Sequence, residues 1–506
     1  MKKIILFLVL IIGCFGLNGC SDEEANNRIV IPIKTGFTSI APDSDIAAAT
    51  KEVLRNLNAG LMRFDSEKNK LVPGLAKEYH MENNGQRYIF VLRDNLTFHN
   101  GEKITSKDVK YSFDRIAGVT TGKPIVGDWK MNLASVDIID DKTVAINIKP
   151  GEEKSSDIYD LADVAIIPAG SKEEDLEKHP VGAGPYKFLE YIPGQKLVLE
   201  AFDNYYLGKP EIKEVEFRVY KEGASRLMAF KSGDIDVLPL TFETEKELQN
   251  QKDIEIVSGL QNDVTLLYLN NSLEIFKNKK VREGIWRSID VDRILSGISL
   301  KSSTKLGSHM SPALMEYYKK GLENKYPYTP EIGKKLLEES GVKNLKFTIK
   351  TIAENNYDND VALFIKEDLK NVGVDVEIEP IPLSQFLPSV FRNHEYEGAI
   401  LRIVGYPDPY RILNRYRTGD ISNMGEYSNP KVDQLLDEAR RTYDSEKNAE
   451  IYKEIQEILN EDIAGVYLMD QGRSVALSSK YTGYKMYPFS FIDVYSIHLK
   501  KTTPKK

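Results

Sequence analysis

Cysteine is almost absent from this chain of 506 residues. The two that occur, Cys14 and Cys20, both lie within the first twenty residues. Everything after Cys20 therefore lacks a thiol, which excludes disulfide bonds, thiolate metal sites and a cysteine nucleophile from the folded body. The stability of that body must come from hydrophobic cores, and a chain of this length predicts at least two lobes, each with a large core.

Recognisable catalytic motifs are also missing. The six histidines form no His-x-His or His-x-x-x-His pair, so there is no zinc signature. Residues 118–123 are one residue too short for a phosphate loop, and Pro124 stands where such a loop needs serine or threonine. Residues 302–305 and 34–36 match two short motifs of penicillin-binding enzymes, but in the reverse order. We therefore expect no enzyme and no cofactor, with His309 as the one weak candidate for a metal ligand.

The chain carries no strong excess of one charge and almost no long apolar run. Its 68 basic and 76 acidic residues give a formal net charge of −8. Nucleic-acid binding needs concentrated lysine and arginine, so we exclude a nucleic-acid partner. The one long apolar run, residues 4–17, would make a helix of about 21 Å, which is too short for a hydrocarbon core of about 30 Å.

That run has the flanks of a secretory signal. Lys2 and Lys3 precede it, and Gly19 and Cys20 follow it. The pattern resembles a bacterial lipobox, in which Cys20 is lipidated and residues 1–19 are removed. Residues 20–28 are polar and acidic, which predicts a flexible tether. We expect an extracytoplasmic protein held on the lipid bilayer of the cell membrane through Cys20.

The rest of the chain alternates segments typical of helices and of strands, which predicts an α/β fold. The clearest strands are expected at 87–92 and 196–202, and the clearest helices at 105–115, 220–231, 279–295, 361–371 and 431–441. Thr105 followed by Asp108 predicts a capping box at the start of one helix. Gly182 and Gly184 predict turns that only glycine adopts easily.

One ordered series of short segments resembles a known family. The segments are 75–79, 87–94, 96–102 and 105–113, followed by 181–187, 201–206, 233–236, 269–271, 280–285, 406–409 and 427–433. Their order is similar to that of the family 5 extracellular solute-binding proteins, the peptide- and nickel-binding subunits of ABC importers. The resemblance runs from about residue 29 to about residue 500.

The resemblance implies a two-lobed fold, like that of periplasmic binding proteins, with a ligand cleft between lobes joined by two hinge strands. On that plan lobe I takes residues 29–266 and the returning tail 475–506, and lobe II takes 267–474. The hinges are expected near 265–269 and 466–472. The implied function is that of a monomeric binding lipoprotein, which captures a small solute and delivers it to an ABC permease. A short peptide is the first choice of ligand.

Eight residues are candidates for contacting that ligand. Thr35, Phe37, Asn58 and Trp129 are expected in lobe I, and Arg402, Tyr406, Asp408 and Arg411 in lobe II. An indole in a polar stretch often marks a contact surface, and two arginines could hold one carboxylate in a forked pair of hydrogen bonds.

The second-lobe loop departs from the peptide-binding relatives at one position. Those relatives commonly carry an aspartate three residues before the Asp of the Asp-Pro pair, where it pairs with the α-ammonium of the peptide. Here that position is Gly405. The departure adds support for the alternative ligand within the family, a nickel or other metal chelate. A short peptide remains the first choice. An extracellular hydrolase or a sensory lipoprotein stays open as a hypothesis from another class.

Overall fold

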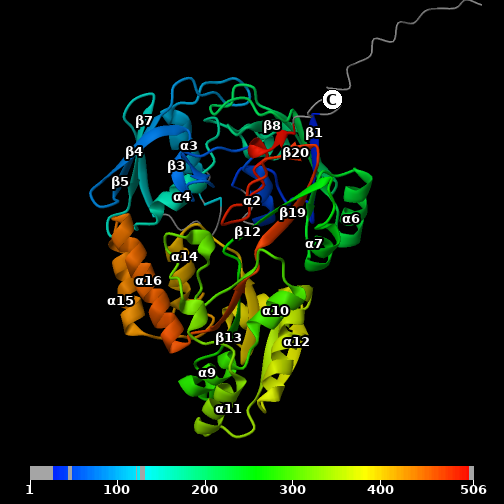
Figure 1. Cartoon of the computed structure of the whole chain (residues 1–506). Helices are drawn as coiled ribbons and strands as arrows, with labels where there is room; N and C mark the ends of the chain where they lie inside the picture. The colour runs from blue at the N-terminus through cyan, green and yellow to red at the C-terminus, as the bar shows by residue number, and fades with distance from the viewer. Residues whose placement is uncertain (1–26, 44–47, 121, 123, 126–131, 501–506) are drawn as a thin grey trace, which may run out of the picture.

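Two bodies of mixed helix and sheet make up the molecule (Figure 1). The computed structural model describes residues 27–43, 48–120, 122, 124, 125 and 132–500. One body contains the first half of the chain, from blue to the green of residues 214–259, and the red C-terminal segment. The other contains the stretch between them, which continues from green through yellow to orange in Figure 1. We call them lobe I and lobe II. The predicted signal peptide and most of the predicted tether lie outside the described residues.

Lobe I contains two sheets that receive the end of the chain. The first has the order β1 (Arg28–Ile33), β10 (Glu214–Val219), β9 (Lys196–Ala201) and β8 (Tyr186–Ile192). The second has the order β11 (Val237–Pro239), β19 (Arg473–Ser478) and β12 (Ile254–Gly259). Lobe I also contains the helices α2 (Ala48–Leu54), α6 (Gly223–Ser232) and α7 (Phe242–Leu248) and the short strands β20 (Tyr481–Thr482) and β21 (His498–Leu499). Because β19 lies between β11 and β12, the chain re-enters lobe I near its end.

A separate layer of lobe I holds the sheet β4 (Ala76–Glu82), β5 (Arg87–Leu92), β7 (Thr143–Ile148) and β6 (Leu133–Ile138). Its helix α3 (Ser106–Ile116) begins at the predicted capping box, where the Thr105 N–H donates to Asp108 Oδ2 at 2.8 Å. Phe90 and Phe113 are fully buried beneath this layer. The same half of the chain also contains the paired strands β2 (Met62–Asp65) and β3 (Lys70–Pro73) and the helices α4 (Asp157–Asp163) and α5 (Glu173–Lys178).

Lobe II is built on one six-stranded sheet. Its strand order is β14 (Thr304–Lys305), β18 (Val466–Asp470), β13 (Val264–Leu269), β17 (Gly398–Ile403), β15 (Lys346–Ile352) and β16 (Asp375–Ile381). Its helices are α8 (Glu274–Lys277), α9 (Lys279–Arg287), α10 (Val291–Ile298), α11 (Pro330–Glu339), α12 (Asn356–Asn371), α13 (Leu383–Phe386), α14 (Pro409–Leu413), α15 (Pro430–Arg441) and α16 (Ser445–Asp462). A continuous apolar cluster packs these helices onto the sheet.

The chain crosses between the lobes twice. It leaves β12 for β13 through residues 260–263 and returns from β18 to β19 through residues 471–472. Buried Asp470 ties the crossings together, because its Oδ2 accepts from the Asn262 N–H at 2.9 Å and its Oδ1 from the Gly472 N–H at 2.8 Å. All of β13 pairs within the lobe II sheet. The boundary expected after residue 266 therefore falls inside a strand, and the first crossing lies a few residues earlier.

The lobes also touch away from the crossings. The Ser155 N–H donates to the Arg440 carbonyl, and Ser155 Oγ donates to the Ala439 carbonyl, both at 2.7 Å. Asn69 Nδ2 donates to the Ala313 carbonyl, also at 2.7 Å. The two Ser155 bonds reach α15, which with α16 faces the first part of the chain in Figure 1.

Two expectations about local structure were wrong. The helix predicted over 279–295 is two helices, α9 and α10, because Asp290 interrupts it and caps α10 by accepting from the Arg293 N–H at 3.0 Å. Gly182 and Gly184 do not adopt positive φ. A Cβ at either would instead collide with the backbone of residues 56–57. Glycine is needed at both positions because the backbone of residues 56–57 lies too close for a side chain, and not because the chain turns there.

Among the described residues, no helix combines the length and the apolar character that spanning a bilayer requires.

Candidate functional site

A cavity of about 600 Å³ opens in lobe I toward lobe II. Its walls come from α2, β2 and the end of α4, together with residues 205–211 and 485–498, and Pro407 reaches it from lobe II. This volume lies within the usual range for small-molecule sites, about 300–1,000 Å³. We call it the first cavity.

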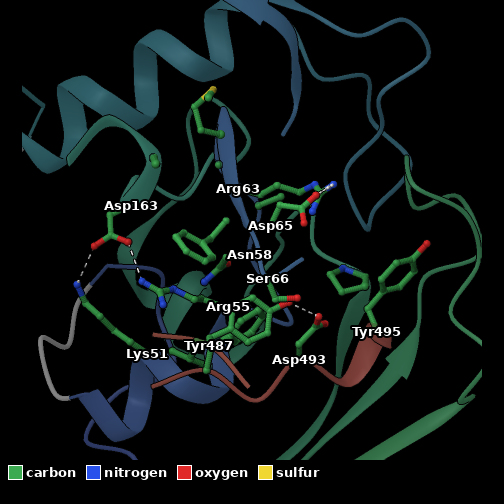
Figure 2. A pocket seen from close by; sticks show the side chains of 18 of the residues that line it. Lys51, Arg55, Asn58, Arg63, Asp65, Ser66, Asp163, Tyr487, Asp493 and Tyr495 are labelled. Atoms are coloured by element: carbon green, nitrogen blue, oxygen red, sulfur yellow. Dashed lines mark hydrogen bonds and ion pairs between the residues drawn. The ribbon is translucent and has the colours of Figure 1, made fainter. Parts of the chain in front are cut away.

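One side of the first cavity is an ion-pair cluster at the C-terminal ends of α2 and α4, formed by Lys51, Arg55 and Asp163 (Figure 2). Arg55 Nη2 lies 2.8 Å from Asp163 Oδ1, and Lys51 Nζ lies 3.7 Å from Asp163 Oδ2. The Arg55 guanidinium also sits 4.6 Å from the centroid of the Phe489 ring. Arg55 and Lys51 together lower the pKa of Asp163 against its burial. Each of the three charges therefore has an oppositely charged partner.

Two polar atoms of the cavity wall have no such partner. Asn58 Oδ1 and Arg63 Nε are buried and make no hydrogen bond with any described residue. Arg63 reaches Asp65 only through Nη2, at 3.7 Å. Buried polar groups in native proteins are almost always hydrogen-bonded. One acceptor and one donor in the same cavity wall therefore indicate where a polar ligand would bind.

The C-terminal segment supplies the aromatic wall. The rings of Phe64 and Phe489 are 5.2 Å apart, and those of Tyr487 and Phe491 are 4.9 Å apart. The Tyr487 hydroxyl donates to Asp493 Oδ2 at 2.6 Å, and burial raises the pKa of that carboxyl. Such a wall offers apolar contact area next to fixed polar groups.

The candidates expected in lobe I fall in different places. Asn58 lines the first cavity. Thr35 is exposed, and neither it nor Phe37 is part of the cavity wall. The Phe37 ring packs 6.1 Å from that of Tyr191. Trp129 lies outside the described residues.

The candidates expected in lobe II are held by their own neighbours. Arg402 Nη1 lies 3.0 Å from Gln471 Oε1 and 3.5 Å from Asp263 Oδ2, at the crossings. The Arg411 guanidinium instead lies 3.9 Å above the Tyr406 ring. The structure therefore does not bring the two arginines onto one carboxylate.

Asp408 is buried at the start of α14, where it accepts from the Tyr410 N–H at 2.9 Å. Its carboxyl lines a second cavity, between the lobes. Burial and, next, the nearby charge of Asp160 raise the pKa of Asp408 to about 7. Asp408 therefore combines a helix-capping role with a position at the lobe interface.

Gly405 is packed against the first crossing. Its N–H donates to Asp263 Oδ1 at 3.0 Å, and a Cβ would collide with the carbonyl oxygen of Gln261. The absence of a side chain at this position is therefore a packing requirement of the crossing itself.

His309 lies in the core of lobe II. Its Nδ1 is 3.0 Å from the Tyr416 hydroxyl, and burial lowers its pKa to about 3. The described part of the chain contains no group of three or more His, Cys, Asp and Glu side chains placed to hold a metal ion. Among the described residues, His309 therefore belongs to no group of side chains that could hold a metal ion.

Sequence patterns missed most of the first cavity. Arg55, Arg63, Asp163 and Tyr487 belong to no motif, and they meet only because the C-terminal segment returns to lobe I. The one available signal was the aromatic content of residues 484–491, which is unusual for a chain end.

The fold and cavity define a class: a bilobed binding protein whose ligand site faces the gap between two lobes joined by two chain crossings. Comparison with known proteins identifies the family. Residues 70–424 match the model for bacterial extracellular solute-binding proteins, family 5 Middle. The chain belongs to this family, and the predicted family and α/β two-lobed fold are confirmed. Family 5 proteins are extracytoplasmic binding proteins of transport systems rather than enzymes.

Relatives with different named ligands share this architecture. The chain is 24% identical to the oligopeptide-binding protein AppA of Bacillus subtilis, over 98% of this chain and 97% of AppA. The solved substrate-binding protein CtaP of Listeria monocytogenes has a TM-score of 0.84 at 22% identity, covering 94% of this chain and 99% of CtaP. NikA of Staphylococcus aureus, solved with Ni(L-His)2, has a TM-score of 0.74 at 21% identity, covering 94% of this chain and all of NikA.

Proposed function

We propose that this protein is the substrate-binding lipoprotein of an ABC importer that takes up short peptides. It captures the ligand in the first cavity, closes lobe II over it and delivers it, as a monomer, to the permease. The observation that carries the proposal is the pair of unpartnered atoms, Asn58 Oδ1 and Arg63 Nε, in a cavity of about 600 Å³ that faces the second lobe. A peptide backbone supplies one N–H donor and one C=O acceptor per residue, which matches this pair.

The test is the identity of the bound solute. The purified protein is denatured, and the released molecules are analysed by mass spectrometry alongside metal analysis of the same sample. Peptides of a few residues at near-stoichiometric amount support the proposal. Stoichiometric nickel with a small chelator would contradict it. Peptide cleavage products that accumulate on incubation would indicate a hydrolase instead.

The alternative ligand is a nickel or other metal chelate. Two observations favour it: Gly405 offers no carboxylate to a peptide ammonium, and NikA shares the fold. Because the described residues hold no metal-ligating cluster, a metal would have to arrive with its own ligands. Free Ni²⁺ should then bind far more weakly than Ni²⁺ mixed with histidine, and titration calorimetry measures both.

We also propose that Cys20 carries the lipid anchor. The pattern of residues 17–20 supports it. Cys20→Ser should move the protein from the membrane fraction to the soluble fraction while leaving ligand affinity unchanged. A Cys20→Ser protein that still sediments with membranes contradicts the anchor.

A further inference from the structure

A second cavity, of about 390 Å³, lies between the two lobes. Lobe I contributes side chains from β4, β5 and the start of α4, and lobe II contributes the start of α14 and the connection from α15 to α16. Tyr159 lines both cavities, and Pro407 of the first cavity is followed by Asp408 of the second. The two cavities are therefore neighbours along the gap between the lobes.

Buried polar atoms at the second cavity lack partners. Tyr88 and Tyr443 line it, and neither of their buried hydroxyls makes a hydrogen bond with a described residue. Asp157 lies just behind this lining, between the lining residues Ser156 and Ile158, and is 1% exposed. One of its carboxylate oxygens accepts from the Lys154 N–H at 2.8 Å, and the other, Oδ1, has no partner among the described residues. After burial, the charge of Asp157 is the next cause that raises the pKa of both tyrosines. Two hydroxyls and one carboxylate oxygen, each able to accept a hydrogen bond, therefore lie here without a partner among the described residues.

Charged groups around the cavity are mainly acidic. The carboxylates whose charge acts on its lining or on Asp157 are Asp157, Asp160, Asp408, Glu153 and Glu316. The cations are Lys154, Arg411, which stacks on Tyr406, and Arg440, which lies 3.6 Å from Glu152. His80 also lines the cavity and lies 3.7 Å from Glu82. The balance of these groups is negative on lobe I, where Asp157 lies, and even on lobe II.

The remaining wall is aromatic. The tyrosines at 79, 159, 317 and 452 line the cavity in addition to Tyr88 and Tyr443. The face of an aromatic ring carries negative partial charge and attracts cations, most strongly where water is excluded. Aromatic faces, unpartnered acceptors and an acidic balance all favour the same kind of occupant.

We propose that the second cavity binds a cationic group of the ligand, a primary ammonium or a guanidinium. Its N–H groups donate to Asp157 and to the Tyr88 and Tyr443 hydroxyls, and its charge lies among the tyrosine rings. The proposal rests on the proposed function, because it names the chemistry of one end of the captured solute. Since both lobes line the cavity equally, an occupant there stabilises the closed arrangement.

The test uses n-butylammonium as the probe and n-butanol, which has a similar shape and no charge, as its control. Binding of each to the full chain is followed by ligand-observed NMR at constant ionic strength. We expect n-butylammonium to bind at least tenfold more tightly than n-butanol. Asp157→Asn and Tyr443→Phe should each weaken n-butylammonium binding at least tenfold. Asp137→Asn, which removes the same charge from exposed strand β6, should leave it unchanged.

Equal binding of the two probes overturns the proposal, and so does full binding of n-butylammonium by both the Asp157 and Tyr443 variants. Competition then identifies the source of the cation. Displacement of the probe by tetra-alanine but not by its acetylated form indicates an N-terminal ammonium, whereas displacement by acetyl-Ala-Ala-Lys-Ala indicates a side chain. None of these outcomes depends on which solute co-purifies, so failure here is distinguishable from failure of the peptide assignment.

Discussion

The two lobes are built on different kinds of core. Lobe II packs its helices and its six-stranded sheet into one continuous apolar cluster. Lobe I divides its apolar residues among several smaller clusters. The first cavity lies where these meet, since Leu54 belongs to one cluster and Met62 to another, and both line it. A single core makes a rigid body that can move as a unit, whereas a divided core leaves room for a ligand.

Core truncations should have the largest effect and should stay within their own lobe. Phe113→Ala in lobe I should destabilise by about 3–5 kcal/mol and Ile455→Ala in lobe II by about 2–5 kcal/mol, since both side chains are fully buried. Hydrogen exchange should speed up only in the lobe that carries the substitution. Faster exchange throughout both lobes in both variants would show that the two lobes unfold as one cooperative unit, which would contradict the idea of two separate cores.

Gly405→Ala should disturb the join between the lobes. The new Cβ would meet the Gln261 carbonyl oxygen, and such overpacking destabilises by about 1–3 kcal/mol. Gly223→Ala is the matched control, because its Cβ meets only Arg226 Nη2 at 3.6 Å. Urea denaturation measures both. A Gly405→Ala protein as stable as the control would show that the crossing is loosely packed.

Acid should destabilise each lobe through one buried histidine. Burial lowers the pKa of His99 in lobe I to about 4 and that of His309 in lobe II to about 3. Below pH 6.5 the unfolded chain binds protons that the folded protein does not, so stability falls with pH until the folded pKa is reached. Each histidine contributes a slope of up to about 1.4 kcal/mol per pH unit.

His99→Asn and His309→Asn should each remove one such contribution between pH 6.5 and 4. Denaturation across that range, compared with the unsubstituted protein, isolates the difference from all other titrating groups. An unchanged slope in either variant means that the histidine in that lobe is protonated in the folded state.

The smallest effect is expected at the contact between the lobes. Ser155→Ala removes the hydrogen bond to the Ala439 carbonyl and should weaken the closed arrangement by about 1 kcal/mol, or roughly fivefold. Ser135→Ala, on exposed β6, is the control, because it removes hydrogen bonds to Asp137 Oδ1 and from Asn147 Nδ2 that both lie within lobe I. Distances between spin labels on the two lobes report the shift. Identical distributions in the two variants would assign the contact no role in closure.

The sequence predicted the class of fold and several individual elements correctly. Strand β5 and the capping box of α3 follow from local composition, and such signals act over a few residues. The break at Asp290 was missed because the apolar spacing continues across it, while the cap forms only with the Arg293 N–H.

The candidate site was harder to predict. Of the eight candidates, Asn58 lines the first cavity and Asp408 the second, while Arg402 and Arg411 are each held by other groups. The cavities join segments hundreds of residues apart, such as Arg55 with Phe489. Their contacts depend on the return of the chain to lobe I, which no local pattern encodes.

The central claim is that lobe II moves as one body and closes over a ligand held by lobe I. Small-angle X-ray scattering with and without a peptide of measured affinity tests it most directly. The account predicts a smaller radius of gyration with peptide, together with stabilisation of about 2.7 kcal/mol at a concentration of one hundred times Kd. An unchanged scattering profile at saturating peptide would contradict it.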